Sequence, residues 1–467
     1  MIEIYGKYVY ETWSLVRQTK VEKMEHRLYW LDCERLIEGI DWRNMKEFFK
    51  GDHMILEKLG SVIRKIPTLR FFARKLKASS HGDICGFSGK RVLKVWHIYA
   101  RTYNFGDHAL GIGVRNLFRK VFRRHGIDLI FEVVDTHRLY VTPHDVQMWN
   151  NEGDLILVGG GGLLHCWDGL HWMCHLPSNL VRRLKIPLCV FGVGYNQLPS
   201  QGRLPWCVRH NIGVVMKKAV GFSVRNDGST EKMHTEGFSV DEIPDPGFFL
   251  DGNYGRVIHD RYAIIQVAGD AASSRMSNVA EWIQGYAKCA DWLMEHGLHV
   301  VFIPHCEMDV NITNDVVNLM TLKNYEITDF WESVLDEHCY TILSLYKHAE
   351  IVIGSRGHAQ MISFGMATPF VTFSTHYKQM ALSEKLGFRD YVTKEPEDFL
   401  RCLMLGCRDR ERIVMHEREV MVKMWQEMES YLDRLATAIL DEHSRWKRSW
   451  FSYKGEQAFD FLRYIFG

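Results

Sequence analysis

Short apolar runs alternate with amphipathic stretches through the first half of the chain. A helical pattern extends from about Ala109 to Arg124, between the first two runs. Apolar runs that alternate with helices are typical of a parallel sheet covered on both faces. The pattern predicts five strands, which are RVLKVWHIYA (91–100), IDLIFEVVD (127–135), DLILVGGGG (154–162), IPLCVFGVG (186–194) and AVGFSVRN (219–226).

The alternation pauses over residues 245–262, where Asp, Pro, Gly and Asn cluster as in an interdomain linker. It resumes with a helical face over residues 276–296, followed by Gly297, a residue typical of helix C-termini. A long charged helix is expected over about 408–446. The further strands predicted are YAIIQVAG (262–269), LHVVFIPH (298–305), EIVIGS (350–355) and PFVTFST (369–375).

This organisation predicts an α/β fold with two Rossmann-like domains and a cleft between them. Ligands of such folds bind beyond the carboxyl ends of the strands, often between the two halves. Residues before the first strand lack strand alternation and predict helices. The expected segments are a helical N-terminal extension (1–88), two Rossmann-like domains (89–252 and 253–407) and a C-terminal helical segment (408–467).

Composition narrows the class of protein. Among 467 residues, 58 are Lys or Arg and 57 are Asp or Glu, so the net charge of +1 gives no global attraction for nucleic acid. No apolar run approaches the roughly 18 residues of a membrane helix, and the N-terminus lacks a secretory apolar core. The 11 cysteines contain no CxxC pair, which indicates free thiols in a reducing compartment. We expect a soluble, cytoplasmic protein without a nucleic-acid partner.

The stretch at residues 64–77 is basic and includes the sequence PTLRFFARKLK. Its Arg and Lys residues alternate with Phe and Leu, and it contains no acidic residue. One interpretation is peripheral contact with an anionic membrane surface. The favoured interpretation is a solvated helix packed on the main body, because Pro67 interrupts a short pattern.

Glycine-rich stretches follow three strands of the first half, at NFGDHA (104–109), GGGG (159–162) and FGVGYNQ (191–197). Glycine lets the backbone approach a ligand, but it also permits tight packing of strand against helix, and both interpretations stay open. GxGxxG and Walker A patterns are lacking, which disfavours a nicotinamide or ATP site. Asp107 either caps the following helix or presents its carboxylate to the cleft for a proton or sugar hydroxyls.

A second candidate cluster follows the strand EIVIGS, where Arg356, Gly357 and His358 precede a helix. A helix N-terminus, a guanidinium fork and an imidazole together favour an anion site. Arg225 ends a strand of the first half, so two arginines from different domains would grip one small polyanion. Lys378 would add charge, although a solvated lysine is an equally good interpretation.

The order of these motifs resembles the polysaccharide pyruvyl transferase family over roughly residues 91–395. The motifs that carry the resemblance are Asn104-Phe105-Gly106-Asp107, Asp154 through Gly161, Gly192-Val193-Gly194, Ser223-Val224-Arg225-Asn226, Asp245-Pro246, Arg356-Gly357-His358, Thr368-Pro369 and Lys378. This chain departs from the family at Gly357, where a larger residue is common, and at Asn226, where Asp is commoner.

The resemblance implies a fold similar to GT-B glycosyltransferases and transfer of the pyruvyl group of phosphoenolpyruvate to two sugar hydroxyls as a ketal. It implies that Arg225, Arg356 and His358 hold phosphoenolpyruvate, with no metal or other cofactor. We further expect His358 to act as an imidazolium acid and Asp107 to be catalytic. The substrate-binding residues expected are Asn104, Gly106, Gly160, Gly161, His165, Trp167, Gly357 and Lys378.

The acceptor sugar is expected against the first domain, at HCWDGLHW (165–172). Trp167 or Trp172 would stack on a pyranose, and His165 or Asp168 would bind its hydroxyls. Burial of these aromatic residues is the favoured alternative. A zinc site is disfavoured, because no matching ligand cluster accompanies His171, Cys174, His175 and Cys166.

Two other functions stay open. A nucleotide-sugar glycosyltransferase of the GT-B type would bind a nucleoside diphosphate, whereas a non-catalytic scaffold for glycan assembly would bind no small anion between its domains.

Overall fold

The computed structural model describes most of the chain after residue 90. The described residues are 91–466, without 102–103, 139, 167, 175, 198–201, 251–253, 271, 273–275, 277 and 329–335. The chain divides into two compact units, residues 1–73 and residues 74–467, and the structure below belongs to the second unit. The predicted helical extension and the basic stretch at 64–77 therefore lie outside the described residues.

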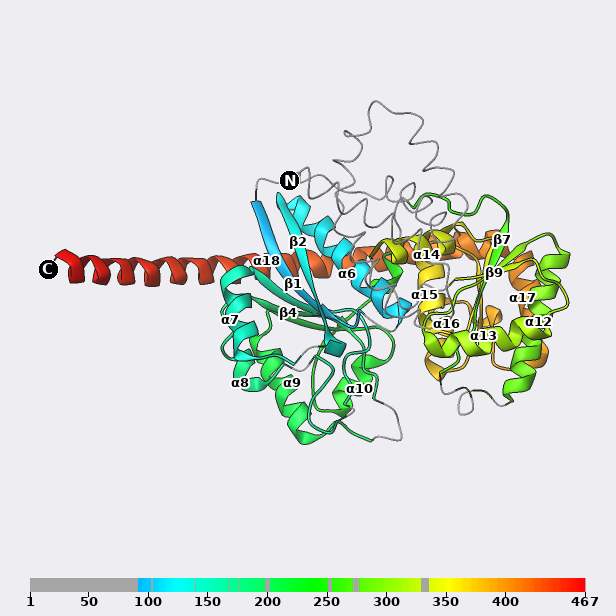
Figure 1. The fold of residues 1–467 in the computed structure, drawn as a ribbon, viewed down its shortest axis with the longest axis horizontal. Coiled ribbons are helices and arrows are strands. Elements are labelled where there is room, and N and C mark those ends of the chain that lie inside the picture. Colours follow the sequence, from blue (N-terminus) through cyan, green and yellow to red (C-terminus); the bar gives the residue numbers. More distant parts are fainter. Residues whose placement is uncertain are drawn as a thin grey trace, which may run out of the picture. The chain divides into compact units, whose positions relative to one another are not determined.

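Two parallel six-stranded sheets form the framework (Figure 1). The first sheet has the order β2-β1-β3-β4-β5-β6 and forms what we call the first lobe. Its strands are β1 (Arg91–Tyr99), β2 (Ile127–Asp135), β3 (Leu155–Gly159), β4 (Leu188–Val193), β5 (Gly221–Arg225) and β6 (Asp241–Ile243). All five predicted strands are present, and only the three-residue edge strand β6 was missed.

The second sheet has the order β12-β11-β10-β7-β8-β9 and forms the second lobe. Its strands are β7 (Tyr262–Gln266), β8 (His299–Phe302), β9 (Tyr325–Ile327), β10 (Ile351–Gly354), β11 (Phe370–Phe373) and β12 (Val392–Thr393). The four predicted strands form its centre. The two missed strands lie at its edges, where two or three residues are too few to show an apolar period.

Helices connect successive strands in each lobe. In the first lobe they are α6 (Phe105–Arg124), α7 (Pro143–Glu152), α8 (Ser178–Val181), α9 (Trp206–Lys218) and α10 (Ser229–Thr235). In the second lobe they are α12 (Val279–Glu295), α13 (Glu307–Leu319), α14 (Asp336–His348), α15 (Gly357–Gly365), α16 (Tyr377–Leu386) and α17 (Phe399–Arg408). The predicted α/β class with two Rossmann-like sheets is confirmed.

Strand periodicity gives each sheet two buried faces. On β1, Leu93 and Val95 join the core that contains the apolar face of α6. Trp96 and Ile98 point the other way and pack with residues of α7 and α9 such as Trp149. Burial on both faces explains why these strands read as continuous apolar runs.

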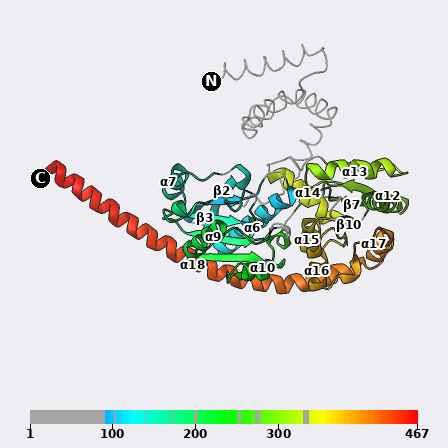
Figure 2. The ribbon, with the colours of Figure 1, turned by 90° about the horizontal axis from the view of Figure 1, so that it is seen from below.

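A single long helix, α18 (Arg410–Phe466), packs against both lobes (Figure 2). Near its start, His416 bonds the carbonyl of Leu386 in the second lobe at 2.8 Å. Further along, His443 bonds Asp154 of the first lobe at 2.8 Å. The predicted charged helix is therefore present, but it begins after a break at Asp409 and continues well beyond residue 446.

The segment between β6 and β7 was predicted to be an interdomain linker, but part of it packs in the core. Phe248 and Leu250 are fully buried in the core that includes α6, and a short 3-10 helix covers Pro246–Phe248. Within the part of the chain that the structure describes, no helix is both long and apolar enough to span a bilayer.

The lobes contact each other directly beside the ends of their strands. The N–H of Phe105 donates to the carbonyl of His305 in the second lobe at 2.8 Å. Asp336 of the second lobe accepts from His108 and from Arg115 of α6, each at 2.8 Å. Although burial opposes it, these partners hold the pKa of Asp336 well below its usual range. A buried charge cluster therefore fixes the start of α6 against α14.

Candidate functional site

Each sheet reverses its winding direction at one pair of strands, β1 and β3 in the first and β7 and β10 in the second. Ligands of doubly wound sheets bind at such switch points, beyond the carboxyl ends of the strands. The predicted motifs follow these strands: Asp107 follows β1, the four glycines end β3, and Arg356 and His358 follow β10. The switch points of the two sheets therefore carry the candidate chemistry.

The start of α6 is capped by Asn104, whose side-chain oxygen accepts from the N–H of Gly106 at 2.8 Å. The N–H of Phe105 donates to the carbonyl of His305 in the other lobe. Asp107 is therefore not the cap, and the side-chain oxygen of Asn104 is used to cap α6. Of the two roles predicted for Asp107, the helix cap is therefore excluded.

Three motif glycines, Gly106, Gly161 and Gly194, each lie against one candidate side chain, and we call these positions the glycine seats. A Cβ added to Gly106 would lie 2.1 Å from Nδ1 of His358, so the imidazole rests on the first turn of α6. A Cβ on Gly194 would lie 2.4 Å from Nε of Arg225. A Cβ on Gly161 would lie 3.1 Å from Oδ1 of Asp107. Glycine is required wherever a side chain passes this close to the backbone.

The other glycines of the opening stretch serve packing. Gly160, with a φ of 82°, fits against the backbone of α6 at Leu110. Gly162 fits against Asn196. Gly357 differs, because no atom of the described residues lies within 4 Å of the position of its Cβ. The departure from a larger residue at Gly357 thus leaves open space beside Arg356 and His358.

Arg225 is held by two acids of its own lobe. Its Nε donates to Asp227 at 2.8 Å and its Nη1 to Asp245 at 3.2 Å. Asn226 accepts from the N–H of Asp245 at 3.1 Å, so the departure at Asn226 supports the partner of Arg225 rather than the reactive groups. Nη2 of Arg225 has no hydrogen bond to any residue that the structure describes.

Arg356 is held even more tightly. Its Nε and Nη2 form a bidentate pair with Asp309 at 2.7 and 2.6 Å, and Nη2 also lies 2.7 Å from Asp270. Gln266 accepts from its backbone N–H at 2.9 Å. Within the described residues, Nη1 of Arg356 makes no hydrogen bond. One Nη group of each arginine is therefore available to an incoming anion, while acids fix the rest.

Asp107 and His358 have shifted proton affinities. Burial raises the pKa of Asp107 above its usual value, against the charges of Arg225 and Arg356. Burial, followed by Arg225, His305 and Arg356, lowers the pKa of His358 well below its usual range. Both arginines therefore act electrostatically on Asp107 and on His358. We call Asp107, Arg225, Arg356 and His358 the reactive cluster.

A second imidazole, His305, lies next to this cluster and was missed by the motifs. It is fully buried, and burial lowers its pKa to about 3. Its Nε2 bonds the hydroxyl of Tyr346 at 2.8 Å. Nδ1 is buried without a hydrogen-bond partner among the residues the structure describes. Burial therefore favours the neutral form of His305.

The acids that hold the arginines were also missed as site residues. Asp227 and Asp245 follow β5 and β6, whereas Asp270 and Asp309 follow β7 and begin α13. Each of these acids follows a strand, and this position was the signal that the sequence offered for them. Their type alone is uninformative, because acids are common in such loops.

The predicted acceptor residues are distributed differently from the expectation. Trp172 is 1% exposed and donates to Asn211 at 2.7 Å, so burial, the favoured interpretation, is confirmed for this residue and stacking on a sugar is not. His165 is buried and bonds the carbonyl of Gly162 at 2.7 Å. Asp168 organises its own loop by accepting from the N–H groups of Leu170 and His171 at 2.8 Å.

Two further predicted residues cannot be placed. Trp167 lies outside the described residues, and for Lys378 only the backbone is described, in the first turn of α16. His175 of the disfavoured zinc set is also outside them. The residues that the structure does describe contain no group of three or more metal-ligating side chains arranged for an ion.

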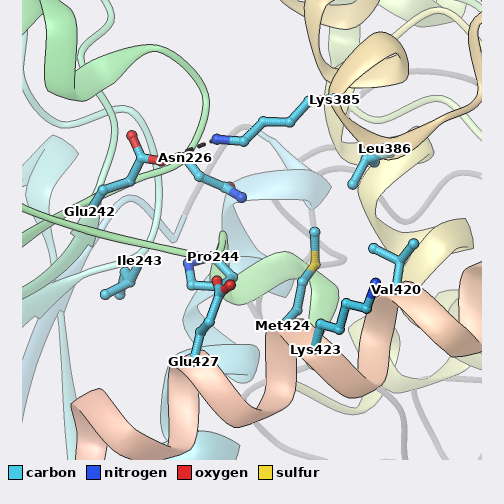
Figure 3. Close-up of a pocket in the computed structure, with 10 residues that line it drawn as sticks. All are labelled: Asn226, Glu242, Ile243, Pro244, Lys385, Leu386, Val420, Lys423, Met424 and Glu427. Carbon is cyan, nitrogen blue, oxygen red and sulfur yellow. Dashed lines mark hydrogen bonds and ion pairs between the residues drawn. The ribbon is translucent and has the colours of Figure 1, made fainter.

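A cavity of about 220 Å³ lies between the two lobes and α18 (Figure 3). Asn226 and Glu242 of the first lobe, Lys385 of α16 and Lys423 of α18 line it. Lys385 and Glu242 form an ion pair at 3.1 Å that bridges the lobes. None of the reactive cluster lines this cavity, so we assign the candidate site to the switch points instead.

Comparisons with solved structures return proteins of sugar metabolism. A UDP-GlcNAc 2-epimerase from Neisseria meningitidis bound to UDP-GlcNAc is 12% identical, with 76% of this chain and 100% of that chain covered and a TM-score of 0.43. The enzyme of that name from Methanocaldococcus jannaschii is 10% identical, with 72% and 99% covered and a TM-score of 0.43. An O-GlcNAc transferase mutant from Thermobaculum terrenum is 12% identical, with 82% and 75% covered and a TM-score of 0.38. No match is found among curated proteins.

The family comparison is more specific. The model of the polysaccharide pyruvyl transferase family matches residues 104–377, from the cap of α6 to the start of α16. This range is more than half of the 467 residues and contains all four members of the reactive cluster. The resemblance read from the ordered motifs is confirmed, and the chain belongs to the polysaccharide pyruvyl transferase family.

Proposed function

We propose that the protein transfers the pyruvyl group of phosphoenolpyruvate to two hydroxyls of a sugar acceptor, forming a cyclic ketal and releasing phosphate. The observation that supports this proposal is that the ring of His358 lies against Gly106 of the opposite lobe, where Arg225 of one lobe and Arg356 of the other both act on Asp107 and His358. Phosphoenolpyruvate places a carboxylate and a phosphate a few bonds apart. Two guanidinium groups from opposite sides would offset that charge.

The start of α15 supports anion binding at the same place. Arg356 is its N-cap residue and provides no side-chain cap, so the first N–H groups of the helix point toward the space beside Gly357. The positive end of the helix dipole favours an anion there. Because acids already hold both arginines, their positions are fixed before the donor arrives, which lowers the entropic cost of binding.

The reaction requires one acid and one base. A proton adds to the methylene carbon, the central carbon becomes electrophilic, and one sugar hydroxyl attacks it with loss of its proton. The C–O bond to phosphate then breaks, and the second hydroxyl closes the ketal and loses its proton. Of the two hydroxyl protons, one balances the proton given to carbon and the other leaves on phosphate. General acid–base catalysis of this kind contributes about 10²–10⁴-fold.

The shifted pKa values favour an assignment opposite to the expected imidazolium acid. We assign the acid to Asp107, because burial favours its protonated form. We assign the base to His358, because burial and neighbouring positive charge favour its neutral form in the free protein. Pairs of groups whose environments separate their pKa values are typical of acid–base sites.

The test of the function is a direct comparison of ligands. Calorimetric titration of the full chain with phosphoenolpyruvate and with UDP-GlcNAc separates this proposal from a nucleotide-sugar glycosyltransferase. We expect binding of phosphoenolpyruvate and its conversion to phosphate when a sugar acceptor is added. Binding of the nucleotide sugar alone would support the glycosyltransferase, and binding of neither would support a scaffold.

Donor binding is expected to take up protons. A bound trianion raises the pKa of Asp107, the assigned acid, so this group holds its proton more tightly in the complex than in the free protein, whereas His358, whose pKa lies well below its usual range, stays available as the base. Affinity for phosphoenolpyruvate should therefore fall as pH rises above about 7, where the phosphate itself is already fully ionised. Calorimetry in buffers of different ionisation enthalpy measures this uptake. Proton release on binding would contradict the assignment.

The glycine seats give a prediction that needs no change to a reactive group. Gly106→Ala should displace the ring of His358, and Gly194→Ala should displace the guanidinium of Arg225. A misplacement of about 1 Å costs on the order of 100-fold in turnover. Gly255→Ala is the matched control, because nothing lies near its Cβ position. Phosphate release is measured for the three variants. Near-native turnover of Gly106→Ala would show that the contact between His358 and Gly106 is unimportant.

A further inference from the structure

Trp206 is exposed on the first lobe to an unusual degree. It begins α9, and 72% of its surface is accessible. Large aromatic side chains are mostly buried in soluble proteins, and an exposed one often marks a binding site. No other tryptophan whose side chain the structure describes is among the exposed large hydrophobic residues.

The ring of Trp206 is held in place rather than free to rotate. His210, one turn further along α9, stacks on it with ring centroids 5.5 Å apart and an interplanar angle of 20°. Pro205 precedes it at the N-cap and restricts the backbone where the helix begins. One face of the indole is therefore supported, and a rigid aromatic surface binds ligands with little loss of entropy.

The same surface is joined to the loop after β3, where the motifs predicted an acceptor. The thiol of Cys207 lies 3.4 Å from the carbonyl of Gly169. The neighbouring Leu170 is 61% exposed. Asp168, also exposed, has its pKa held below the usual range by hydrogen bonds from His171, which outweigh the effect of burial. The start of α9, which carries Trp206, and the loop that carries Asp168 and Leu170 are therefore adjacent.

Topology places this surface on the reactive side of the lobe. α9 follows β4 and leads back to the beginning of β5, so its first residue lies toward the carboxyl ends of the parallel strands. The loop 160–176 leaves the adjacent strand β3 at the same edge. Trp206 and the reactive cluster therefore share one edge of the first sheet, although Trp206 contacts none of the cluster.

We propose that Trp206, with Asp168 and Leu170, forms a subsite for a sugar of the acceptor other than the one that receives the pyruvyl group. The indole stacks on the apolar C–H face of a pyranose, and the carboxylate of Asp168 accepts from its hydroxyls. This inference rests on the proposed function and adds a second sugar-binding position to it.

The test uses the full chain and defined sugars. Maltopentaose, cellopentaose, mannopentaose and β-1,4-galactopentaose are titrated against wild type, each beside its monosaccharide, with tryptophan fluorescence and calorimetry as readouts. At least one pentasaccharide should bind on the order of tenfold more tightly than its monosaccharide. Trp206→Ala should abolish that gain, whereas Trp206→Phe should retain most of it. Leu319→Ala, at an exposed apolar residue of the second lobe, is the matched control.

Two outcomes overturn the subsite. One is that no pentasaccharide binds wild type more tightly than its monosaccharide, and the other is that Trp206→Ala binds them equally well. Failure of the proposed function has a different signature. Wild type would then bind no phosphoenolpyruvate while the dependence of oligosaccharide binding on Trp206 persisted.

Discussion

Replacing His358 by alanine is expected to lower the turnover of pyruvyl transfer by about 10²–10⁴-fold, the usual contribution of a general base. The ring lies over Gly106 of the opposite lobe, and its neutral form is favoured in the free protein. Without it, the attacking hydroxyl has no group in the reactive cluster that readily accepts a proton. Phosphate release under saturating phosphoenolpyruvate measures the loss.

Two comparisons make this result specific. His296→Ala removes an exposed imidazole that stacks on Trp292 and does not belong to the reactive cluster. This variant should leave turnover unchanged. Asp107→Asn should lower turnover as well, but it should remove the high-pH limb of the pH profile, which reports loss of the proton from the acid, rather than the low-pH limb, which reports the base. If His358→Ala retained more than about a tenth of wild-type turnover, a base assigned to His358 would be untenable.

Arg356→Ala is expected to abolish donor binding and also to destabilise the fold by about 3–5 kcal/mol. The reason is Asp309, which is fully buried and forms a bidentate pair with this guanidinium at 2.6 and 2.7 Å. Removing the arginine leaves a buried carboxylate whose charge is uncompensated. In the native protein, Arg356 outweighs burial and holds the pKa of Asp309 below its usual value.

A double variant separates stability from function. Arg356→Ala combined with Asp309→Asn should recover part of the lost stability, because no unpaired charge remains, but should not recover binding of phosphoenolpyruvate. The deficit of the single variant should also shrink as pH falls, since protonation neutralises Asp309. Arg261→Ala is the control, because that arginine is 63% exposed and pairs with Glu350 at the surface, where such pairs contribute about 1 kcal/mol or less.

Equal stability of Arg356→Ala and wild type in chemical denaturation would argue against the charge coupling. Retained affinity of the double variant for phosphoenolpyruvate would remove Arg356 from the donor site.

The sequence alone determined the central strands of both sheets and the order of the motifs. Strands such as β3 and β10, covered on both faces, must be apolar throughout, and this requirement is visible in a single chain. The ends of these strands then mark where chemistry collects, which is why Asp107, Arg225, Arg356 and His358 were identified before any contact was known. Edge strands and helix ends were less visible, because few buried residues specify them.

Only the tertiary structure decided what each motif residue touches. The sequence left the glycines ambiguous between ligand contact and packing, and it could not reveal that Gly106, Gly161 and Gly194 support side chains that come from elsewhere in the chain. It could not distinguish buried Trp172 from exposed Trp206, since both are aromatic residues after a strand. Proton affinity depends on burial and on charges brought together across two lobes. For that reason the lowered pKa of His358 could be inferred only once the two sheets were placed in contact.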